Sequence, residues 1–509
     1  MKIFETREIR EIDQYTIHHE PVASVDLMER AAHGCTSWIV ENLPSEKHLV
    51  VFTGPGNNGG DGWAIARQLA SREGYSVRLY HLNTGSGISP DAEINRRRLA
   101  VQALVPIAEI NSEADFPLLS PREVVIDALF GSGLSRPLTG LAASLIKHIN
   151  AAGSKIISID IPSGLMGEDN TGNDPHSIVK ATVTLTFQFP KRAFFYSENG
   201  EYTGKWVVIP IGLHQGIIDE KKTDFFYVTR EEVAAGFRKR KTFSHKGTYG
   251  HALLISGQYG MMGAAILAAR SCLRSGVGLL TTHVPELGYQ VMQPAVPESI
   301  FSIDPSREQI STCPPLYKYS AVGAGPGIGT EAETASAIER LLKKSAKPLV
   351  LDADALNILS QRPGLLSSIP ENTILTPHPG EFDRLAGKSA NACIRNQTQI
   401  EFSKTYRVIL LLKGAYTSVS LPNGKCFFNS TGNPGMATAG CGDVLTGMIL
   451  SLLAQGYAPD EAAITGAYLH GLAGDLSAAE HGELALIASD VVDQIGNAFK
   501  IIERHDHSA

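Results

Sequence analysis

The stretch HLVVFTGPGNNGGDGWAIARQLA, residues 48–70, decides the fold class of this chain. It begins with HLVVFTG, a mostly apolar run of the length of one strand. A glycine-rich turn follows, and the segment from Trp63 to Ala70 has the apolar spacing of a helix. A strand, a glycine-rich turn and a helix in this order predict one βα unit.

Strand-like runs and helical segments continue to alternate, in two series. The first series contains YSVRLYHL (75–82), EVVIDALFG (123–131), KIISIDIPSG (155–164) and ATVTLTF (181–187). The second contains GHALLISGQ (250–258), VGLLTTHV (277–284), YSAVGAGPG (319–327), PLVLDADAL (348–356), TILTPHPGE (373–381) and VILLLKGAYTSVS (408–420). Residues 215–242 between the two series are charged and lack long apolar runs, so we interpret them as a linker. The pattern predicts two tandem α/β domains, residues 1–220 and 221–509, each with a mostly parallel sheet covered by helices.

Composition and charge argue against several classes of protein. Of the 509 residues, 43% are hydrophobic and 19% are charged, as in ordinary folded chains. The net charge of −7 argues against a dedicated nucleic-acid binder, and the basic run Arg238–Lys241 is interpreted as an exposed segment. No run approaches the roughly 18 apolar residues that a membrane span needs, and the N-terminus lacks the order of a secretory signal. We therefore expect a cytoplasmic protein without nucleic-acid or membrane partners.

The glycine-rich motif Asn57–Gly62 is the first candidate site. It is predicted between a strand and a helix, where glycines let backbone amides approach a ligand and a helix start favours an anion. A phosphate site is one interpretation, and a tight turn with a capping aspartate is the other. The motif is not GxGxxG, which disfavours a Rossmann dinucleotide site.

Two further strand ends carry aspartates. Asp127 precedes the flexible loop 131–137, and Asp160 precedes Pro162-Ser163-Gly164. Each aspartate alone is compatible with a helix cap, but ligands of open parallel sheets gather at the carboxyl ends of strands, so together they favour a binding cleft. Oxygen atoms of Asn58, Asp127 and Ser163 are also suitable ligands for a hard cation.

The motif NPGMATAGCGD, residues 433–443, is the strongest candidate in the second series. It directly precedes a helical segment, so its amide groups and the helix dipole suit the binding of a phosphoryl group. Asp443 lies where a base can take the proton of an attacking hydroxyl group. Glycine-mediated helix packing is the alternative interpretation, and the absence of GK[ST] separates the motif from a P-loop.

Weaker candidates follow other strands of the second series. Lys413-Gly414-Ala415-Tyr416-Thr417 can reach a nucleotide phosphate or form an ordinary turn. His378 can contact a substrate or merely order its proline-rich turn. The glycine loop 323–329 and the aspartates Asp352 and Asp354 close two more strands. Together these segments are predicted to line one edge of a sheet.

These motifs resemble those of a known enzyme family. NNGGDG, DALFGSGLSRP and DIPSG, in this order, resemble the epimerase domain of the NAD(P)H-hydrate repair enzymes over about residues 1–215. KGTYGHALLISG, the helix around residues 260–280, GPGIG, DADAL, TPHPGE, KGAYT and NPGMATAGCGD resemble the ADP-dependent dehydratase domain over about residues 225–505. The resemblance implies an N-terminal Rossmann-like three-layer domain and a C-terminal ribokinase-like domain.

The resemblance also implies two activities in one chain. The first domain would interconvert the R and S epimers of hydrated NADH and NADPH, known as NADHX and NADPHX. The second would use ADP with Mg²⁺ to phosphorylate the C6 hydroxyl group of the S hydrate, and loss of phosphate would then restore NAD(P)H. K⁺ in the first domain and a homo-oligomer are implied as well.

The site residues implied by the resemblance fall into four sets, with Asp160 and Asp443 as the catalytic residues. The epimerase substrate would contact Asn57, Asn58, Gly59, Gly60, Asp61, Gly131, Ser132, Gly133, Leu134, Ser135, Arg136, Pro137 and Asp160. The potassium ion would be held by Asn58, Asp127 and Ser163. The hydrate in the dehydratase domain would contact Ala264, Gly327, His378 and Asp443. The nucleotide would contact Lys413, Gly414, Ala415, Tyr416, Thr417 and Gly442.

Two residues depart from the family pattern. Ala439 and Cys441 stand where the family usually has Gly and Thr, but both are small and leave the backbone donors free. Cys441 lies at a helix start, which can lower the pKa of a thiol, yet no histidine partner is evident and a catalytic thiol is disfavoured. None of the six cysteines forms a CxxC pair, and we expect all of them to be reduced.

Two other functions stay open at this point. A small-molecule kinase of the ribokinase type would phosphorylate a vitamin or sugar and release a stable phosphorylated product. Alternatively, the N-terminal half is a nucleotide-sensing or protein-binding module without catalysis. Asp160 and Asn58 argue against such a module, whose function would survive the loss of the Asp160 carboxylate.

Overall fold

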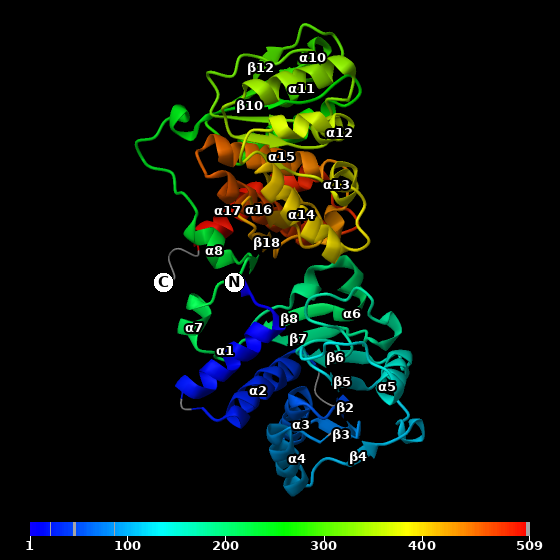
Figure 1. The fold of residues 1–509 in the computed structure, drawn as a ribbon. Coiled ribbons are helices and arrows are strands. Elements are labelled where there is room, and N and C mark those ends of the chain that lie inside the picture. Colours follow the sequence, from blue (N-terminus) through cyan, green and yellow to red (C-terminus); the bar gives the residue numbers. More distant parts are fainter. Residues whose placement is uncertain (21, 44–46, 86, 505–509) are drawn as a thin grey trace. The chain divides into compact units, whose positions relative to one another are not determined.

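The computed structural model describes residues 1–20, 22–43, 47–85 and 87–504. The chain divides into two compact units. The first consists of residues 2–223 with residues 391–393, and the second consists of the remaining residues from Asp224 onward together with Met1. Figure 1 shows the elements of both units.

The first unit is built on a parallel sheet. Its strands are β2 (Lys47–Thr53), β3 (Tyr75–Leu82), β4 (Ile107–Ile110), β5 (Val124–Ala128), β6 (Lys155–Ile159), β7 (Val183–Phe187) and β8 (Lys205–Ile209), and a short strand, β1 (Lys2–Ile3), precedes them. The sheet order is β4-β3-β2-β5-β6-β7-β8, and each neighbouring pair is parallel. The chain enters the sheet at β2 in the middle and adds β3 and β4 on one side, then returns to add β5, β6, β7 and β8 on the other side. The position between β2 and β5 is therefore the point where the strand order switches.

Helices cover both faces of this sheet. They are α1 (Thr6–His19), α2 (Ser24–Asn42), α3 (Asn57–Ala70), α4 (Pro90–Gln102), α5 (Gly140–Ala151), α6 (Gly200–Thr203) and α7 (Gln215–Glu220). Leu49 and Val51 of β2 share one buried cluster with α2, α3 and α4, whereas Val50 and Phe52 share another with α5. Burial on both faces explains why the strand is apolar without alternation, and it confirms the predicted three-layer arrangement.

The second unit contains a longer, mixed sheet. Its strands are β9 (Phe225–Tyr227), β10 (His251–Ile255), β11 (Leu279–Val284), β12 (Ile300–Ile303), β13 (Ala321–Ala324), β14 (Leu349–Leu351), β15 (Ile374–Leu375), β16 (Ile409–Leu412), β17 (Ser418–Ser420) and β18 (Cys426–Phe428). Their order is β9-β18-β17-β16-β15-β14-β13-β10-β11-β12. The strands from β16 to β12 are parallel, while β17 is antiparallel to both of its neighbours. The mostly parallel sheet confirms the predicted α/β class of the second domain.

The helices of the second unit pack on both faces of its sheet (Figure 1). They are α8 (Arg230–Ala235), α9 (Met262–Arg274), α10 (Glu286–Ala295), α11 (Ala332–Lys344), α12 (Asp354–Gln361), α13 (Pro379–Ala386), α14 (Ala392–Tyr406), α15 (Cys441–Ala454), α16 (Pro459–His481) and α17 (Ala488–Arg504). Helix α15 packs closely against α9. A Cβ atom at Gly447 of α15 would come within 2.1 Å of the Ala268 carbonyl oxygen of α9, so only glycine fits at this contact.

The interpretation of residues 215–242 as a linker is wrong for much of the segment. Helix α7 packs in the first unit, where Ile218 is buried. Strand β9 pairs with β18, and Val228 and Val233 join a buried cluster of the second unit. The elements of this segment are short and lie at the surface, so only a few of their side chains are buried. The other positions can be charged, which explains why the segment resembles a linker.

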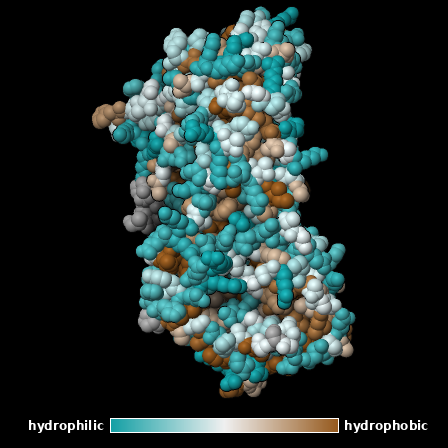
Figure 2. Space-filling model, in the orientation of Figure 1, coloured by the Kyte–Doolittle hydropathy of each residue, from teal (hydrophilic) through white to brown (hydrophobic). Residues whose placement is uncertain are grey.

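The surface is mainly polar on the face that Figure 2 shows, with single hydrophobic side chains between hydrophilic ones. Such scattered apolar side chains are normal for a folded protein. Within the part of the chain that the structure describes, no helix has both the length and the apolar character needed to cross a membrane.

Candidate active sites

The first candidate site lies where the loops after β2, β5 and β6 meet. Gly131 of the β5 loop abuts Asn58 at the start of α3, with only 3.1 Å between an added Cβ atom and the Asn58 Cβ atom. The Ser132 amide donates to Asp160 Oδ2 at 3.2 Å. Ser163 Oγ donates to Asp127 Oδ1 at 2.5 Å. The strand order β2-β5-β6 therefore brings together the predicted residues of three separate motifs.

The NNGGDG motif is part of a helix and does not form a turn before it. Helix α3 begins at Asn57, so the motif makes up its first turns. A Cβ atom at Gly59 would come within 1.9 Å of the Gly54 carbonyl oxygen, and one at Gly62 within 2.7 Å of the Ala128 side chain. These glycines let α3 pack closely on the strands, while the amides of its first residues, which lack intrahelical acceptors, remain available to an anion.

Asn58 has the properties expected of a ligand to a cation. Its side chain is buried, and among the described residues neither atom of its amide has a hydrogen-bond partner. Beside it, the Phe130 amide donates to Ser163 Oγ at 2.8 Å, and Ser163 Oγ lies 3.1 Å from the Phe130 carbonyl oxygen. Burial raises the pKa of Asp127, although its hydrogen bonds from Ser163 and Ser158 oppose the rise. An unpaired amide oxygen next to carboxylate, hydroxyl and carbonyl oxygens fits a K⁺ ion.

Asp160 is held in an unusual conformation and in an ionised state. Its φ angle is 65°, in the left-handed region that non-glycine residues rarely adopt, and such strain is common at functional sites. Burial raises the pKa of Asp160, but the Lys191 ammonium group 2.8 Å away outweighs burial, and the pKa lies below its ordinary value. The Asp160 carboxylate is therefore charged at neutral pH.

Two other carboxyl groups near Asp160 have raised pKa values, in contrast to the lowered pKa of Asp160. Burial and the charge of Asp160 raise the pKa of Asp61 well above its ordinary value, and they raise that of Asp13 on α1 to about 6. Helix α1 also contacts the 131–137 loop. Its Arg10 guanidinium group fills the space beside Gly133. The site thus combines one ionised carboxylate with carboxyl groups that hold a proton more tightly, which suits acid–base chemistry.

The remaining residues of the 131–137 loop lie at the entrance. Gly133, Ser135, Arg136 and Pro137 are exposed, whereas Leu134 is half-buried. Arg136 is exposed, so its guanidinium group is accessible to a charged ligand. The loop therefore joins the site through Gly131 and Ser132 and leaves its far end at the surface.

The second candidate site lies at the N-terminus of α15. Gly440 enters the helix with a φ of 92°, and a Cβ atom there would come within 2.5 Å of Leu267 Cδ1. Asp443 lies in the first turn of α15. Burial and the nearby Asp352 carboxylate raise the pKa of Asp443 to about 7, although Lys413 opposes the rise. A carboxyl group with such a pKa can both accept and release a proton near neutral pH.

Lys413 points at this helix start and not at open solvent. Its Nζ atom lies 2.9 Å from Asp352 Oδ1, and Thr446 Oγ1 of α15 donates to Asp352 Oδ2 at 2.7 Å. A Cβ atom at Gly442 would lie 3.2 Å from Lys413 Nζ. Burial lowers the pKa of Lys413, but the Asp352 and Glu381 carboxylates outweigh burial and raise it. The lysine is therefore a fixed positive charge beside the α15 amides.

Two predicted substrate residues meet on the other side of this edge. Gly327, with a φ of 63°, would place a Cβ atom 3.1 Å from the Ala264 side chain and 2.8 Å from the Met261 carbonyl oxygen. The next glycine, Gly329, donates its amide to Asp354 Oδ2 at 2.9 Å. The glycine loop, α9 and the DADAL segment are thus in contact, as the shared strand edge predicts.

His378 and the 413–417 turn have structural roles in addition to any contact with a ligand. His378 Nδ1 accepts hydrogen bonds from the Gly380 and Glu381 amides and so caps α13, while half of its side chain stays exposed. The residues Gly414, Ala415, Tyr416 and Thr417 form the turn between β16 and β17. Gly414 and Ala415 are exposed there, which leaves their backbone accessible to a nucleotide.

The start of α15 does not lower the pKa of the Cys441 thiol. The side chain is buried, and burial raises its pKa to about 11. The thiol is therefore protonated at neutral pH and packs as a small apolar group. Ala439 is exposed in the loop before it, and nothing in the structure explains the choice of alanine there.

Several residues of these sites carry no sequence motif. Lys191 follows β7 in an irregular segment and reaches Asp160 only because β6 and β7 are neighbours. Asp13 lies on an amphipathic helix whose pattern indicates only a surface helix. His470 on α16 contacts the Cys441 backbone, and its Nε2 atom is buried without a partner among the described residues; burial lowers its pKa to about 4. No local signal distinguishes these three residues from ordinary polar positions.

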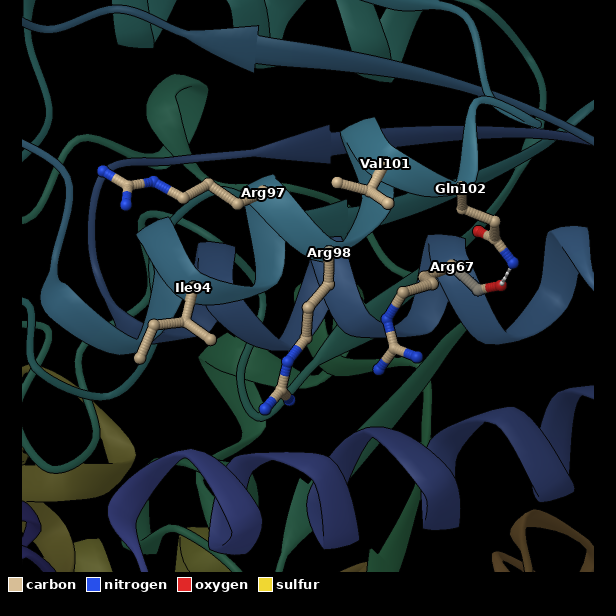
Figure 3. Close-up of a pocket in the computed structure, with 6 residues that line it drawn as sticks. All are labelled: Arg67, Ile94, Arg97, Arg98, Val101 and Gln102. Carbon is tan, nitrogen blue, oxygen red and sulfur yellow. Dashed lines mark hydrogen bonds between the residues drawn. The ribbon is translucent and has the colours of Figure 1, made fainter.

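The outside of the first unit also carries a hollow of about 560 Å³ on α4 and the neighbouring α3 (Figure 3). It is lined by Arg67, Ile94, Arg97, Arg98, Val101 and Gln102. Arg67 and Arg98 point the same way in the figure and both pair with Glu29 of α2. Each of these arginines already pairs with a carboxylate, Arg67 and Arg98 with Glu29 and Arg97 with Glu93, so we do not interpret the hollow as a candidate active site.

Comparison with known proteins finds two family models and relatives that match almost the entire chain. A model described as YjeF-related protein N-terminus matches residues 24–193, and one described as NAD(P)H-hydrate dehydratase matches residues 252–497. The bifunctional NAD(P)H-hydrate repair enzyme Nnr of Moorella thermoacetica is 34% identical, over 99% of this chain and 97% of its own length. The enzyme of the same name from Escherichia coli is 30% identical, over 95% of this chain and 92% of its own.

A solved structure is similar to the second unit. It is the ADP/ATP-dependent NAD(P)H-hydrate dehydratase from Bacillus subtilis, co-crystallised with ATP and Mg²⁺. It is 33% identical and covers 55% of this chain and 99% of its own, with a TM-score of 0.48.

Proposed function

The chain belongs to the family of bifunctional NAD(P)H-hydrate repair enzymes, and on this premise we propose how its two sites divide the work. The first unit interconverts the R and S epimers of NADHX and NADPHX, and the second dehydrates the S hydrate at the expense of ADP. The observation that carries the proposal is that relatives of this family match the chain over 99% of its length, so both sites belong to one enzyme.

In the first unit, Asp160 is the catalytic base of the epimerase. Epimerisation at C6 requires the hydroxyl group to leave one face of the ring and water to add to the other. A carboxyl group with a raised pKa, such as Asp61, supports departure by donating a proton to the hydroxyl oxygen. The Asp160 carboxylate, kept ionised by Lys191, stabilises the cationic ring and takes a proton from the incoming water.

In the second unit, Asp443 is the base of the dehydratase. It takes the proton of the C6 hydroxyl group, whose oxygen attacks the terminal phosphorus of ADP, and AMP leaves. Lys413 and the amides at the start of α15 stabilise the negative charge on the transferred phosphoryl group. Phosphate then departs from C6 and a ring proton is lost, which restores the double bond of NAD(P)H. Phosphate leaves far more readily than hydroxide, which accounts for the use of a nucleotide.

The remaining residues follow from these two roles. The first residues of α3 and the 131–137 loop hold the epimerase substrate, and Ala264, Gly327 and His378 hold the hydrate in the dehydratase. The 413–417 turn and Gly442 contact the nucleotide. Asn58, Asp127 and Ser163 would hold K⁺, which would supply positive charge in the epimerase site, and Mg²⁺ would accompany the ADP phosphates. A cytoplasmic location and a homo-oligomeric state remain predictions.

The experiment is a recovery assay with the full chain. An R and S mixture of NADHX is incubated with Mg²⁺ and ADP, with Mg²⁺ and ATP, or without nucleotide, and the return of NADH absorbance is followed. Complete recovery of both epimers only with nucleotide is expected. No recovery with either nucleotide would overturn the proposal and would favour a vitamin or sugar kinase.

A second arm separates the two sites. The Asp160→Asn variant is expected to recover only the S fraction promptly, with the rest following at the spontaneous rate of epimerisation. If Asp160→Asn still recovers both epimers at the wild-type rate, Asp160 is not the catalytic residue of the epimerase. If the wild type itself recovers only the S fraction promptly and Asp160→Asn behaves identically, the first unit is a sensing or protein-binding module without catalysis.

A further inference from the structure

Asp475 of α16 binds the start of the loop that leads into α15. Its Oδ2 atom accepts the Gly432 amide at 3.0 Å, and its Oδ1 atom accepts Asn433 Nδ2 at 3.0 Å. Both donors lie immediately before or at the beginning of the NPGMATAGCGD motif. Asp475 itself belongs to a helix that contributes no residue to any of the predicted site sets.

The hydrogen bonds continue from Asp475 into the loop. Asn433 uses its other amide atom, Oδ1, to accept the Gly435 amide at 3.0 Å, and so caps the short 3-10 turn Pro434–Met436. The Asn433 side chain thus donates to α16 and accepts from the loop at the same time. Its orientation, and the orientation of the turn behind it, depend on the Asp475 carboxylate.

Helix α16 also supports the loop through close backbone packing. A Cβ atom at Gly471 would come within 2.6 Å of the Thr431 carbonyl oxygen, and one at Gly474 within 2.2 Å of Met436 Sδ. Thr431 Oγ1 donates to the Tyr468 carbonyl oxygen of α16 at 2.7 Å. The loop therefore follows the surface of α16 over residues 431–436.

The middle of this loop lies at the surface. Gly432, Pro434, Ala437 and Ala439 are exposed, so the hydrophobic core does not fix their backbone. The far end of the loop is fixed by α15 itself, where the Val444 amide donates to the Gly440 carbonyl oxygen. At the near end, the hydrogen bonds to Asp475 add to the contacts of Thr431 and Met436 with α16.

We propose that Asp475 is a positioning residue of the dehydratase reaction, which acts through Asn433 to fix the course of residues 432–436, the part of the loop that leads to the α15 amides proposed to face the transferred phosphoryl group. The proposal rests on the dehydratase function proposed above. Backbone donors stabilise a transition state only when their geometry is set before the reaction, and a displacement of about 1 Å can lower the rate by ~10²-fold. A misplaced loop lowers kcat with saturating ADP more than it changes the affinity for the hydrate.

The test exchanges the two side chains that face each other. In Asp475→Asn, the new amide can still accept the Gly432 amide, but its NH₂ group faces the NH₂ group of Asn433 and one hydrogen bond is lost. In Asn433→Asp, two carboxylates face each other. In the double variant Asn433→Asp/Asp475→Asn, the new amide donates to the new carboxylate, which also accepts the Gly435 amide, so all three hydrogen bonds form again.

The expected result is a loss in each single variant and a recovery in the double variant. Each single change lowers dehydratase kcat by about tenfold to a hundredfold, and the exchange restores it to within about threefold of the wild type. Epimerase activity of the same polypeptide and the melting temperature report whether the chain is folded. Asp460→Asn, at an exposed position in the first turn of α16, is the matched control and leaves kcat unchanged.

Other outcomes overturn the proposal. Single variants with wild-type kcat, or a double variant that stays as slow as the single ones, would show that the Asp475–Asn433 contact does not set the loop. Loss of epimerase activity together with a lower melting temperature in both single variants would assign Asp475 to folding alone. Absence of dehydratase activity in the wild type would instead remove the function on which the proposal rests.

Discussion

Both candidate sites pair a lysine with a buried aspartate, but the two sites differ in which aspartate the lysine contacts. In the first unit, Lys191 pairs with Asp160 itself, the residue proposed to be catalytic. In the second unit, Lys413 pairs with Asp352, and the proposed base Asp443 lies beside this ion pair. The pKa of Asp160 is consequently lowered, whereas that of Asp443 is raised to about 7. The same two residue types thus produce a carboxylate that is ionised at neutral pH before the reaction in one site and a group that exchanges its proton near neutral pH in the other.

The difference matches the chemistry proposed for each site. A carboxylate that stabilises a cationic ring has to stay ionised, and a directly paired lysine ensures this. A base that removes a hydroxyl proton works best when its pKa is near the working pH. The position of the lysine relative to the catalytic aspartate therefore indicates which of the two roles that aspartate has.

The largest effect is expected from removing the proposed base of the second site. Asp443→Asn should lower the dehydratase kcat by about 10² to 10⁴-fold, because an amide cannot accept the hydroxyl proton. Epimerase activity should be unchanged, and the rate of NADH recovery from pure S hydrate measures the loss. Asp493→Asn, an exposed aspartate on α17, is the control. Wild-type dehydratase activity in Asp443→Asn would show that Asp443 is not the base, and the contrast drawn between Asp443 and Asp160 would no longer hold.

Removing the lysine of the first site should have the next largest effect. Lys191→Met leaves the Asp160 carboxylate buried without its partner, so the pKa of Asp160 rises and epimerase activity falls by about a hundredfold. The free energy of unfolding should also fall, by about 3 to 5 kcal/mol, as measured by urea denaturation. Lys180→Met removes an exposed lysine and should change neither quantity. An epimerase that works normally without Lys191 would show that Asp160 does not need a paired charge.

The pH dependence of the two activities should differ. Below about pH 7 the Asp443 carboxyl group binds a proton and can no longer act as a base, so dehydratase kcat/KM should fall by about tenfold for each pH unit. Asp160 stays ionised over the same range because its pKa is lowered, so the epimerase should not show this decline. Both profiles can be recorded on one protein preparation. A dehydratase that keeps full activity down to pH 5 would mean that the pKa of Asp443 is not raised.

A smaller effect is expected at the proposed potassium site. Asn58→Ala removes an amide oxygen that has no other partner among the described residues, so the K⁺ concentration for half-maximal epimerase activity should rise by about tenfold. Epimerase assays over a series of K⁺ concentrations at constant ionic strength measure the shift. The dehydratase should not respond, since its site contains none of these ligands. An epimerase that is equally active in Na⁺ and K⁺ would argue against the ion.

The smallest effect is expected at Cys441. Because its buried thiol is protonated, Cys441→Ala should change dehydratase kcat by no more than about twofold. Iodoacetamide should inactivate the wild type and the variant equally slowly. Rapid inactivation of the wild type alone would show that the thiol is reactive.

Much of the fold could be predicted because strands and helices of an α/β chain are local patterns. YSVRLYHL coincides with β3, and KIISI within its predicted segment coincides with β6. The prediction failed where local signals conflict. NNGGDG contains residues that usually form turns, yet it is helical because Gly59 and Gly62 allow α3 to lie directly on the strands. Helix–sheet packing of this kind is invisible to a local pattern.

The sequence by itself determined the order of the βα units and the residues that follow each strand, and therefore which polar groups lie at the active edge of each sheet. Only the tertiary structure decided which of these groups are neighbours. Lys191 meets Asp160 because β7 lies next to β6. Asp443 lies near the ion pair of Lys413 and Asp352 because the first turns of α15 contact the residues that follow β14 and β16. The physical reason is that a pKa depends on charges within a few ångströms in space, whereas the sequence orders those charges along the chain.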